Sequence, residues 1–328
     1  MSWTDTVTVA PSPADTALAA LDTGCVISPL TQFGVMRFSG EETMTFLQGQ
    51  LSSDLSKVDD ASAQYSSYST PKGRMLASFL IYRAQGDFLV QISSDLQPAI
   101  QKRLSMFILR SKTKASDATA ELALIGVAGP HAGALVAQVT GAALPEALKV
   151  ADWDMGAIVG LPGERYQLVV SAEQAAGVWQ ALASAGAVSV NADVWRLTEV
   201  RAGTPWITAA TQEEFVPQMA NMELIGAVSF SKGCYPGQEI VARTQYLGKL
   251  KRRMYRVQVP ATAVAGQEVF SPEMNGQPSG RIMLAAPAAA GQSEALVVVQ
   301  MSSLEHGLHL GAPDGPALQV LDLPYAIG

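Results

Sequence analysis

The segment Ser229–Thr244, with the sequence S-F-S-K-G-C-Y-P-G-Q-E-I-V-A-R-T, combines residue types suited to thiol chemistry. Two glycines and a proline within Lys232–Gly237 predict a tight loop, and Gln238–Thr244 predicts a helix. A cysteine just before a helix N-terminus lies at the positive end of the helix dipole, and Lys232 adds a cation two residues away. Because both effects favour the thiolate, we expect Cys234 to have a lowered pKa and a raised reactivity.

The alternative is structural, since a lone cysteine is most often a small buried apolar side chain. The residues alone leave both interpretations open for Cys234. Gly237 would let backbone N–H groups come close to an anionic ligand. Cys25 has no charged or glycine-rich setting, and we expect it to be a packing residue.

The elements around this segment predict an α+β fold, with strands and helices mixed rather than strictly alternating. The predicted strands are 34–40, 65–69, 75–82, 87–92, 121–128 and 166–170, and the predicted helices are 94–109, 130–139, 172–184 and 194–201. After Gly248, short strands separated by Gly and Pro predict a small β-barrel or sandwich. We therefore expect a tail at 1–23, an α+β region at 24–247 and a barrel domain at 248–328.

Composition excludes several classes of protein. The 328 residues carry 22 Lys+Arg and 29 Asp+Glu, so the net charge is −7, which argues against stable, sequence-independent nucleic-acid binding. Two cysteines exclude a disulfide scaffold and a self-held four-thiolate iron–sulphur cluster. His306 and His309 have no further ligands at metal-binding spacing, so we expect no metal site.

No apolar run of about 20 residues occurs and no Lys or Arg precedes Arg37. We therefore expect a cytoplasmic protein without membrane association.

Two basic clusters have open interpretations. Lys249–Arg256 holds five basic residues in eight, and it is either a patch for tRNA or an acidic partner, or a solvated entry into the first barrel strand. Arg110–Lys114 is a second basic run, for which a solvated helix end is one interpretation. For both clusters we favour the solvated interpretation.

The residues Lys232–Glu239, K-G-C-Y-P-G-Q-E, resemble the signature K-G-C-Y-[TP]-G-Q-E of the YgfZ-type folate-binding proteins. These proteins are relatives of the glycine-cleavage T-protein, an aminomethyltransferase, and include iron–sulphur assembly factors. Supporting resemblances lie at Phe46–Asp54, Pro71–Met75, Arg201–Pro205 and Phe215–Glu223. The resemblance covers roughly residues 25–325.

The resemblance implies a T-protein-like, three-part fold, with two interleaved α+β domains, one of them ferredoxin-like, and a C-terminal β-barrel. It implies tetrahydrofolate or a derivative as the cofactor, and iron–sulphur enzymes or assembly proteins as partners. Cys234 and Lys232 would act chemically, and the remaining signature residues would shape the loop: Gly233, Tyr235, Gly237, Gln238 and Glu239. The implied folate contacts are Lys72, Arg74, Arg201, Glu223, Phe230 and Arg243. The alternative interpretation of Arg110–Lys114 is a site for the glutamate tail of the folate.

The implied function is support of iron–sulphur assembly or repair, for [4Fe–4S] enzymes such as the radical tRNA methylthiolation enzyme. The alternatives are a folate-dependent aminomethyl or methyl transferase and a binding scaffold without chemistry. The T-protein has acidic residues, one of them catalytic, where this chain has Ala77 and Ser78. Neither residue can act as a carboxylate base, so we do not expect aminomethyl transfer.

Overall fold

The computed structural model describes residues 3–7, 9, 14–248, 250–289 and 291–327. The chain forms two compact units. The first unit comprises Met1–Phe46, Ser56–Gln64 and Leu80–Thr198, and the second comprises Leu47–Leu55, Tyr65–Phe79 and Glu199–Gly328. Because the chain passes between the units repeatedly, each unit is assembled from segments that are far apart in the sequence. These two units differ from the three domains predicted from the sequence, which have the bounds 1–23, 24–247 and 248–328. The predicted domain bounds stay a prediction.

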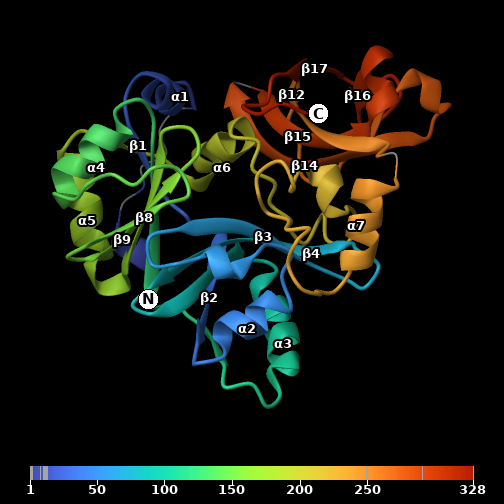
Figure 1. Cartoon of the computed structure of the whole chain (residues 1–328). Helices are drawn as coiled ribbons and strands as arrows, with labels where there is room; N and C mark the ends of the chain where they lie inside the picture. Colours follow the sequence, from blue (N-terminus) through green and yellow to red (C-terminus); the bar gives the residue numbers. More distant parts are fainter. Residues whose placement is uncertain (1–2, 8, 10–13, 249, 290, 328) are drawn as a thin grey trace. The chain divides into compact units, whose positions relative to one another are not determined.

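A six-stranded sheet forms the centre of the first unit, in the order β11-β1-β7-β10-β9-β8. Its strands are β1 (Val26–Pro29), β7 (Leu122–Ala128), β8 (Val150–Trp153), β9 (Gly156–Leu161), β10 (Arg165–Ser171) and β11 (Val188–Ser189). Neighbouring strands are antiparallel except for the pair β1–β11. Helices α4 (Ala132–Thr140) and α5 (Ala172–Ser184) lie against this sheet (Figure 1). Their buried apolar side chains form one core cluster with those of the sheet. Ser171 caps α5, whose predicted bounds are confirmed.

The described part of the predicted tail is folded. Helix α1 (Ala14–Thr23) buries Ala17 and Leu21, and a 3-10 helix, η1 (Trp3–Thr6), precedes it. The Trp3 ring lies 6.1 Å from the Trp179 ring, so the described N-terminal residues add to the core of the first unit. Residues 1–2, 8 and 10–13 of the predicted tail lie outside the described residues.

A second sheet has the order β3-β4-β5-β2-β6. Its strands are β2 (Phe33–Ser39), β3 (Ala63–Ser69), β4 (Met75–Ala84), β5 (Asp87–Ser93) and β6 (Lys114–Asp117), with the short helices α2 (Thr43–Gln48) and η2 (Leu55–Lys57) between them. The residues of β3 and of β4 are divided between the two units. Helix α3 (Gln97–Ile108) buries Ile100 and Leu104 and carries Pro98 in its first turn, as predicted.

A closed barrel dominates the second unit, which confirms the predicted C-terminal β-barrel. Its strands are β12 (Arg252–Val259), β13 (Glu268–Phe270), β14 (Pro278–Ala289), β15 (Gln292–Gln300), β16 (Leu308–Leu310) and β17 (Ala317–Leu321). Helix α6 (Ala192–Arg201) leads into this unit, which also contains α7 (Gln238–Tyr246) and the 3-10 helices η3 (Pro217–Ala220), η4 (Pro272–Met274) and η5 (Met301–Glu305). Among the described residues, no helix is long and apolar enough to cross a membrane.

Candidate functional site

The signature loop lies in the second unit and leads directly into α7, which begins at Gln238 as the residues predict. Cys234 is exposed, whereas the next residue, Tyr235, is buried. The loop therefore presents the thiol to solvent on a backbone that is anchored on both sides of it.

Lys232 provides the anchor on the N-terminal side. Its Nζ donates to three main-chain carbonyl oxygens, those of Gln48 at 2.6 Å, Leu51 at 2.6 Å and Ser53 at 2.8 Å. The ring of Tyr235 covers the ammonium at 5.2 Å, a cation–π contact. Burial lowers the pKa of Lys232 to about 8, although the negative charge of Asp54 opposes this effect.

These contacts give Lys232 a task that the residues did not predict. An ammonium has three protons to donate, and each is used on a carbonyl of the turn at 48–53. Any action of Lys232 on the Cys234 thiol is therefore an effect of its charge through space. We call this arrangement, Lys232 with the carbonyls of Gln48, Leu51 and Ser53, the lysine clamp.

Buried serines hold the turn that accepts the lysine clamp. Ser52 Oγ lies 2.8 Å from Ser67 Oγ and donates to the Ala227 carbonyl at 2.7 Å, and Ser229 N donates to the Ser52 carbonyl at 2.8 Å. Ser53 Oγ donates to Ser66 Oγ at 2.7 Å. The turn is thus tied both to β3 and to residues 227–229, which lead into the signature loop.

Two glycines anchor the loop on its C-terminal side. Gly237 has φ +82°, and a Cβ atom there would lie 2.5 Å from the Thr70 carbonyl oxygen. Gly73 has φ +72°, and its added Cβ would lie 3.0 Å from the Ile240 side chain. The turn at 70–73 therefore packs directly on the start of α7. This close backbone packing explains the glycine at 237, where the sequence led us to expect the approach of an anionic ligand.

Glu223 is a predicted folate contact whose environment fits a ligand with hydrogen-bond donors. Its side chain is 7% exposed, and Oε1 pairs with Arg253 Nη1 at 2.5 Å. Burial raises the pKa of the Glu223 carboxyl, while Arg253 opposes this effect. In the described part of the chain, Oε2 is buried without a hydrogen-bond partner. A buried acceptor of this kind is costly unless something donates to it, and the N–H edge of a pterin is such a donor.

The other predicted folate contacts have different surroundings. Arg201 forms an ion pair with Glu294 of β15 at 3.1 Å, and Arg256 binds the same carboxylate at 2.7 Å, so Arg201 is part of a structural triad. Arg74 is exposed and donates to the Glu214 carbonyl at 2.6 Å, and Lys72 beside it is exposed. Arg243 is exposed on α7. Phe230 is half-buried, with its ring 5.8 Å from that of Tyr246.

Ala77 and Ser78, the positions that are acidic in the T-protein, are buried in β4. Ser78 Oγ accepts a hydrogen bond from Ile207 N at 2.9 Å, so it supports the backbone. Neither side chain supplies a carboxylate, and this position has no group that could take a proton from an amine.

The basic cluster 249–256 is partly an ion-pair element. Arg253 binds Glu223, and Arg256 binds Glu294, both from β12. Lys249 lies outside the described residues. The pairing residues are far from the cluster in sequence, so the cluster alone could not indicate them.

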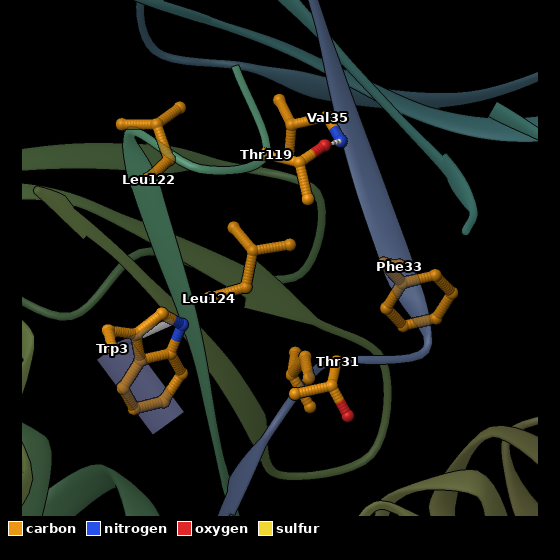
Figure 2. A pocket seen from close by; sticks show the side chains of 8 residues that line it. Trp3, Thr31, Phe33, Val35, Thr119, Leu122 and Leu124 are labelled. Atoms are coloured by element: carbon orange, nitrogen blue, oxygen red, sulfur yellow. Dashed lines mark hydrogen bonds between the residues drawn. The ribbon is translucent and has the colours of Figure 1, made fainter. Parts of the chain in front are cut away.

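No group of three or more His, Cys, Asp or Glu side chains in the described ranges is arranged to hold a metal ion. A cavity of about 140 Å³ lies in the first unit, lined by Trp3, Phe33 and Leu124 among other residues (Figure 2). Its polar side-chain groups are the indole N–H of Trp3 and the hydroxyls of Thr31 and Thr119, and Thr119 Oγ1 already accepts from Val35 N at 3.0 Å. The cavity therefore lacks charged groups for a polar cofactor.

Comparison with known proteins identifies the family of this chain. The GCVT N-terminal domain family matches residues 13–225. A "tRNA-modifying protein YgfZ" from Klebsiella pneumoniae is 30% identical over 304 residues, covering 91% of this chain and 92% of that protein. The chain belongs to the YgfZ-type branch of the GCVT family. A YgfZ from Colwellia psychrerythraea is 32% identical over 229 residues, 69% of each chain.

The fold of this YgfZ-type chain is that of the T-protein. The glycine cleavage system aminomethyltransferase T from Bartonella henselae superposes with a TM-score of 0.73, covering 95% of this chain and 89% of that one, at 14% identity. At this identity the likeness concerns the fold alone. It confirms the α+β, T-protein-like architecture that the signature implied.

Proposed function

We propose that this YgfZ-type protein binds a tetrahydrofolate derivative and supports the assembly or repair of iron–sulphur clusters in other proteins. The observation that carries the proposal is the exposed Cys234 thiol on a loop anchored by the lysine clamp. A thiolate is a natural ligand for iron and a nucleophile toward sulphur. Two cysteines cannot hold a four-thiolate cluster within the chain, so the cluster would belong to a partner.

The relatives are named tRNA-modifying proteins, which supports an iron–sulphur enzyme that modifies tRNA as the beneficiary. We propose the radical tRNA methylthiolation enzyme as one such client. The protein itself would act on the enzyme's cluster and would not need to bind tRNA stably, in keeping with its net charge of −7.

For folate, Glu223 is the residue whose environment fits best. Its buried and unpartnered Oε2 would accept from the pterin ring, and Arg253 would hold the carboxylate in place through Oε1. Exposed Lys72 and Arg243 are available for the anionic glutamate tail. When bound, tetrahydrofolate would supply one-carbon or reducing chemistry. Arg201, held by Glu294, is not proposed as a contact.

Aminomethyl transfer has less support, because Ala77 and Ser78 offer no carboxylate. Turnover of an aminomethylated lipoyl carrier by the purified protein would support this alternative function.

Calorimetric titration of the purified protein with tetrahydrofolate tests the ligand. We expect one site per chain and at least tenfold weaker binding by Glu223→Gln. The matched control is Glu305→Gln, which changes an exposed glutamate of the same unit. Absence of binding by the wild type, or equal binding by Glu223→Gln, would contradict the assignment.

Complementation tests the cellular role. In a bacterium that lacks its own YgfZ-type protein, the wild-type chain should restore the activity of [4Fe–4S] enzymes. Unrestored activity, with the chain present in folded form, would reject the proposal.

A further inference from the structure

Residues Lys102–Lys114, which we call the α3 tip, carry a charge opposite to that of the whole chain. The segment contains the last part of α3 and the turn that leads to β6, both in the first unit. It has five basic residues and no acidic residue, in a protein with a net charge of −7. The five are Lys102, Arg103, Arg110, Lys112 and Lys114. Such local charge separation marks a surface with a preferred kind of partner.

Three large apolar side chains stand exposed within this basic segment. Met106 is 60% exposed, Phe107 is 48% exposed and Leu109 is 86% exposed. Helix α3 lies beside β2 (Figure 1). Its buried residues include Ile100 and Leu104, and helical spacing puts Met106 on the opposite face of the helix, one turn after Lys102. These side chains contribute little to the core, and a cluster of exposed apolar residues with a polar rim is typical of a protein-binding surface.

Leu109 is also in a strained backbone conformation. It follows the last residue of α3 with φ 44° and ψ −105°. Helices commonly end on a glycine in the left-handed region, because other residues are strained there. A leucine that is both strained and exposed does not serve the isolated fold, and strained residues concentrate at functional sites.

The cations of the tip are largely available. Lys112 pairs with Glu41 at 2.9 Å, an exposed ion pair of little energetic consequence. In the part of the chain that the structure describes, Lys102, Arg110 and Lys114 form no ion pair. The apolar side chains thus lie in the same segment as three cations, Lys102, Arg110 and Lys114, that form no ion pair among the described residues.

We propose that the α3 tip is a docking surface for a partner protein that presents an apolar groove bordered by carboxylates. Met106, Phe107 and Leu109 enter the groove, and Lys102, Arg110 and Lys114 meet the carboxylates. A symmetric pair of copies of this chain would bring one basic tip against the other, which disfavours self-association through it. Phosphates of nucleic acid would use the cations but leave the aliphatic Met106 and Leu109 without apolar partners. This surface is independent of Cys234 and of the proposed function.

The experiment begins in cells, with a photo-crosslinking phenylalanine derivative in place of Leu109 in the full-length chain. A second chain carries the same group in place of Leu144, an exposed apolar residue of the first unit. We expect a crosslink to a protein from position 109 and not from position 144. Nucleic acid, lipid or a second copy as the crosslinked species, or no crosslink at all, would overturn the proposal.

The partner protein identified by the crosslink is then purified separately, and its affinity for the full-length chain without the photo-crosslinking group is measured. We expect affinity to fall with added salt and to fall at least tenfold with Met106→Ser and with Arg110→Glu. Met155→Ser, at another exposed methionine of the first unit, should leave it unchanged.

Leu109→Gly separates docking from folding. Because glycine accepts φ 44° without strain, this variant should unfold at the same or a higher temperature and still bind at least tenfold more weakly. Wild-type affinity of Leu109→Gly or of Arg110→Glu would overturn the proposal.

Discussion

The two cysteines show how different surroundings give one side chain opposite properties. Cys25 is 4% exposed beside β1 of the first unit, within an apolar cluster, and burial raises its pKa to about 11. Cys234 is exposed on a loop of the second unit, between the lysine clamp and the N-terminus of α7. Cys25 stabilises the fold by packing, whereas Cys234 adds nothing to a core and is held where another molecule can reach it.

Thiol labelling gives the largest expected difference between the two cysteines. With iodoacetamide at pH 8, the folded protein should be modified at Cys234 roughly a hundredfold or more faster than at Cys25, because Cys25 is buried and protonated. Mass spectrometry of tryptic peptides over time measures both rates. Cys234→Ala should leave the native protein almost unlabelled. Comparable labelling rates at Cys234 and Cys25 would contradict the difference in accessibility between the two thiols.

Removal of the lysine clamp should destabilise the loop that carries Cys234. Lys232→Met keeps an unbranched side chain that is one atom shorter, but it leaves three carbonyls without a donor, at a cost of about 2–4 kcal/mol. Urea denaturation measures this loss. Lys72→Met is the matched control, because Lys72 is an exposed lysine of the same unit, and it should change stability by less than about 0.5 kcal/mol. Equal stability of the two variants would show that the clamp is unimportant.

The glycine at the start of α7 provides a smaller test of the same loop. Gly237→Ala places a Cβ against the Thr70 carbonyl in a left-handed backbone, and we expect a loss of about 2–3 kcal/mol. Gly226→Ala is the control, since Gly226 has φ +74° and open space around it, so only the backbone cost of about 1 kcal/mol applies. If both variants lose the same free energy of unfolding, the close packing of Gly237 on Thr70 does not contribute to the stability of the loop.

The smallest expected effect concerns pH. The pKa of Lys232 is about 8 in the folded protein, below the value of about 10.4 for an unfolded chain. Between these two values the unfolded chain binds a proton that the folded chain has lost. The contribution of Lys232 to the free energy of unfolding should therefore rise with pH across this window. Urea denaturation of wild type and Lys232→Met at pH 7.5 and 9.5 measures it, and a constant or shrinking difference would contradict the prediction.

Much of this architecture could be predicted from local sequence. The helix at 172–184 has a capping serine and a regular apolar pattern, and the loop and helix at 232–246 are indicated by Gly, Pro and Gln-Glu. Local sequence does not predict β8 and β9, because Asp152 interrupts the apolar pattern of β8, and Gly156 and Gly160 interrupt that of β9.

The site was less accessible to sequence analysis. The lysine clamp uses main-chain carbonyls, which every residue has and no side-chain pattern reveals. The only local signal was the pair of Ser-Ser sequences at 52–53 and 66–67, whose hydroxyls hold the turn. The resemblance alone names Arg201 as a folate contact, and that contact stays a prediction. Its ion pair with Glu294 could not be predicted from local sequence, because the two residues are 93 positions apart along the chain.

The most direct test of the account compares the two cysteines in a bacterium that lacks its own YgfZ-type protein. Methylthiolated nucleosides in its tRNA would be measured by mass spectrometry after wild type, Cys25→Ala or Cys234→Ala is supplied at equal levels. We predict full restoration by wild type and by any folded Cys25→Ala, and at least a tenfold deficit with Cys234→Ala. Restoration by Cys234→Ala equal to that by wild type would contradict the role of this thiol.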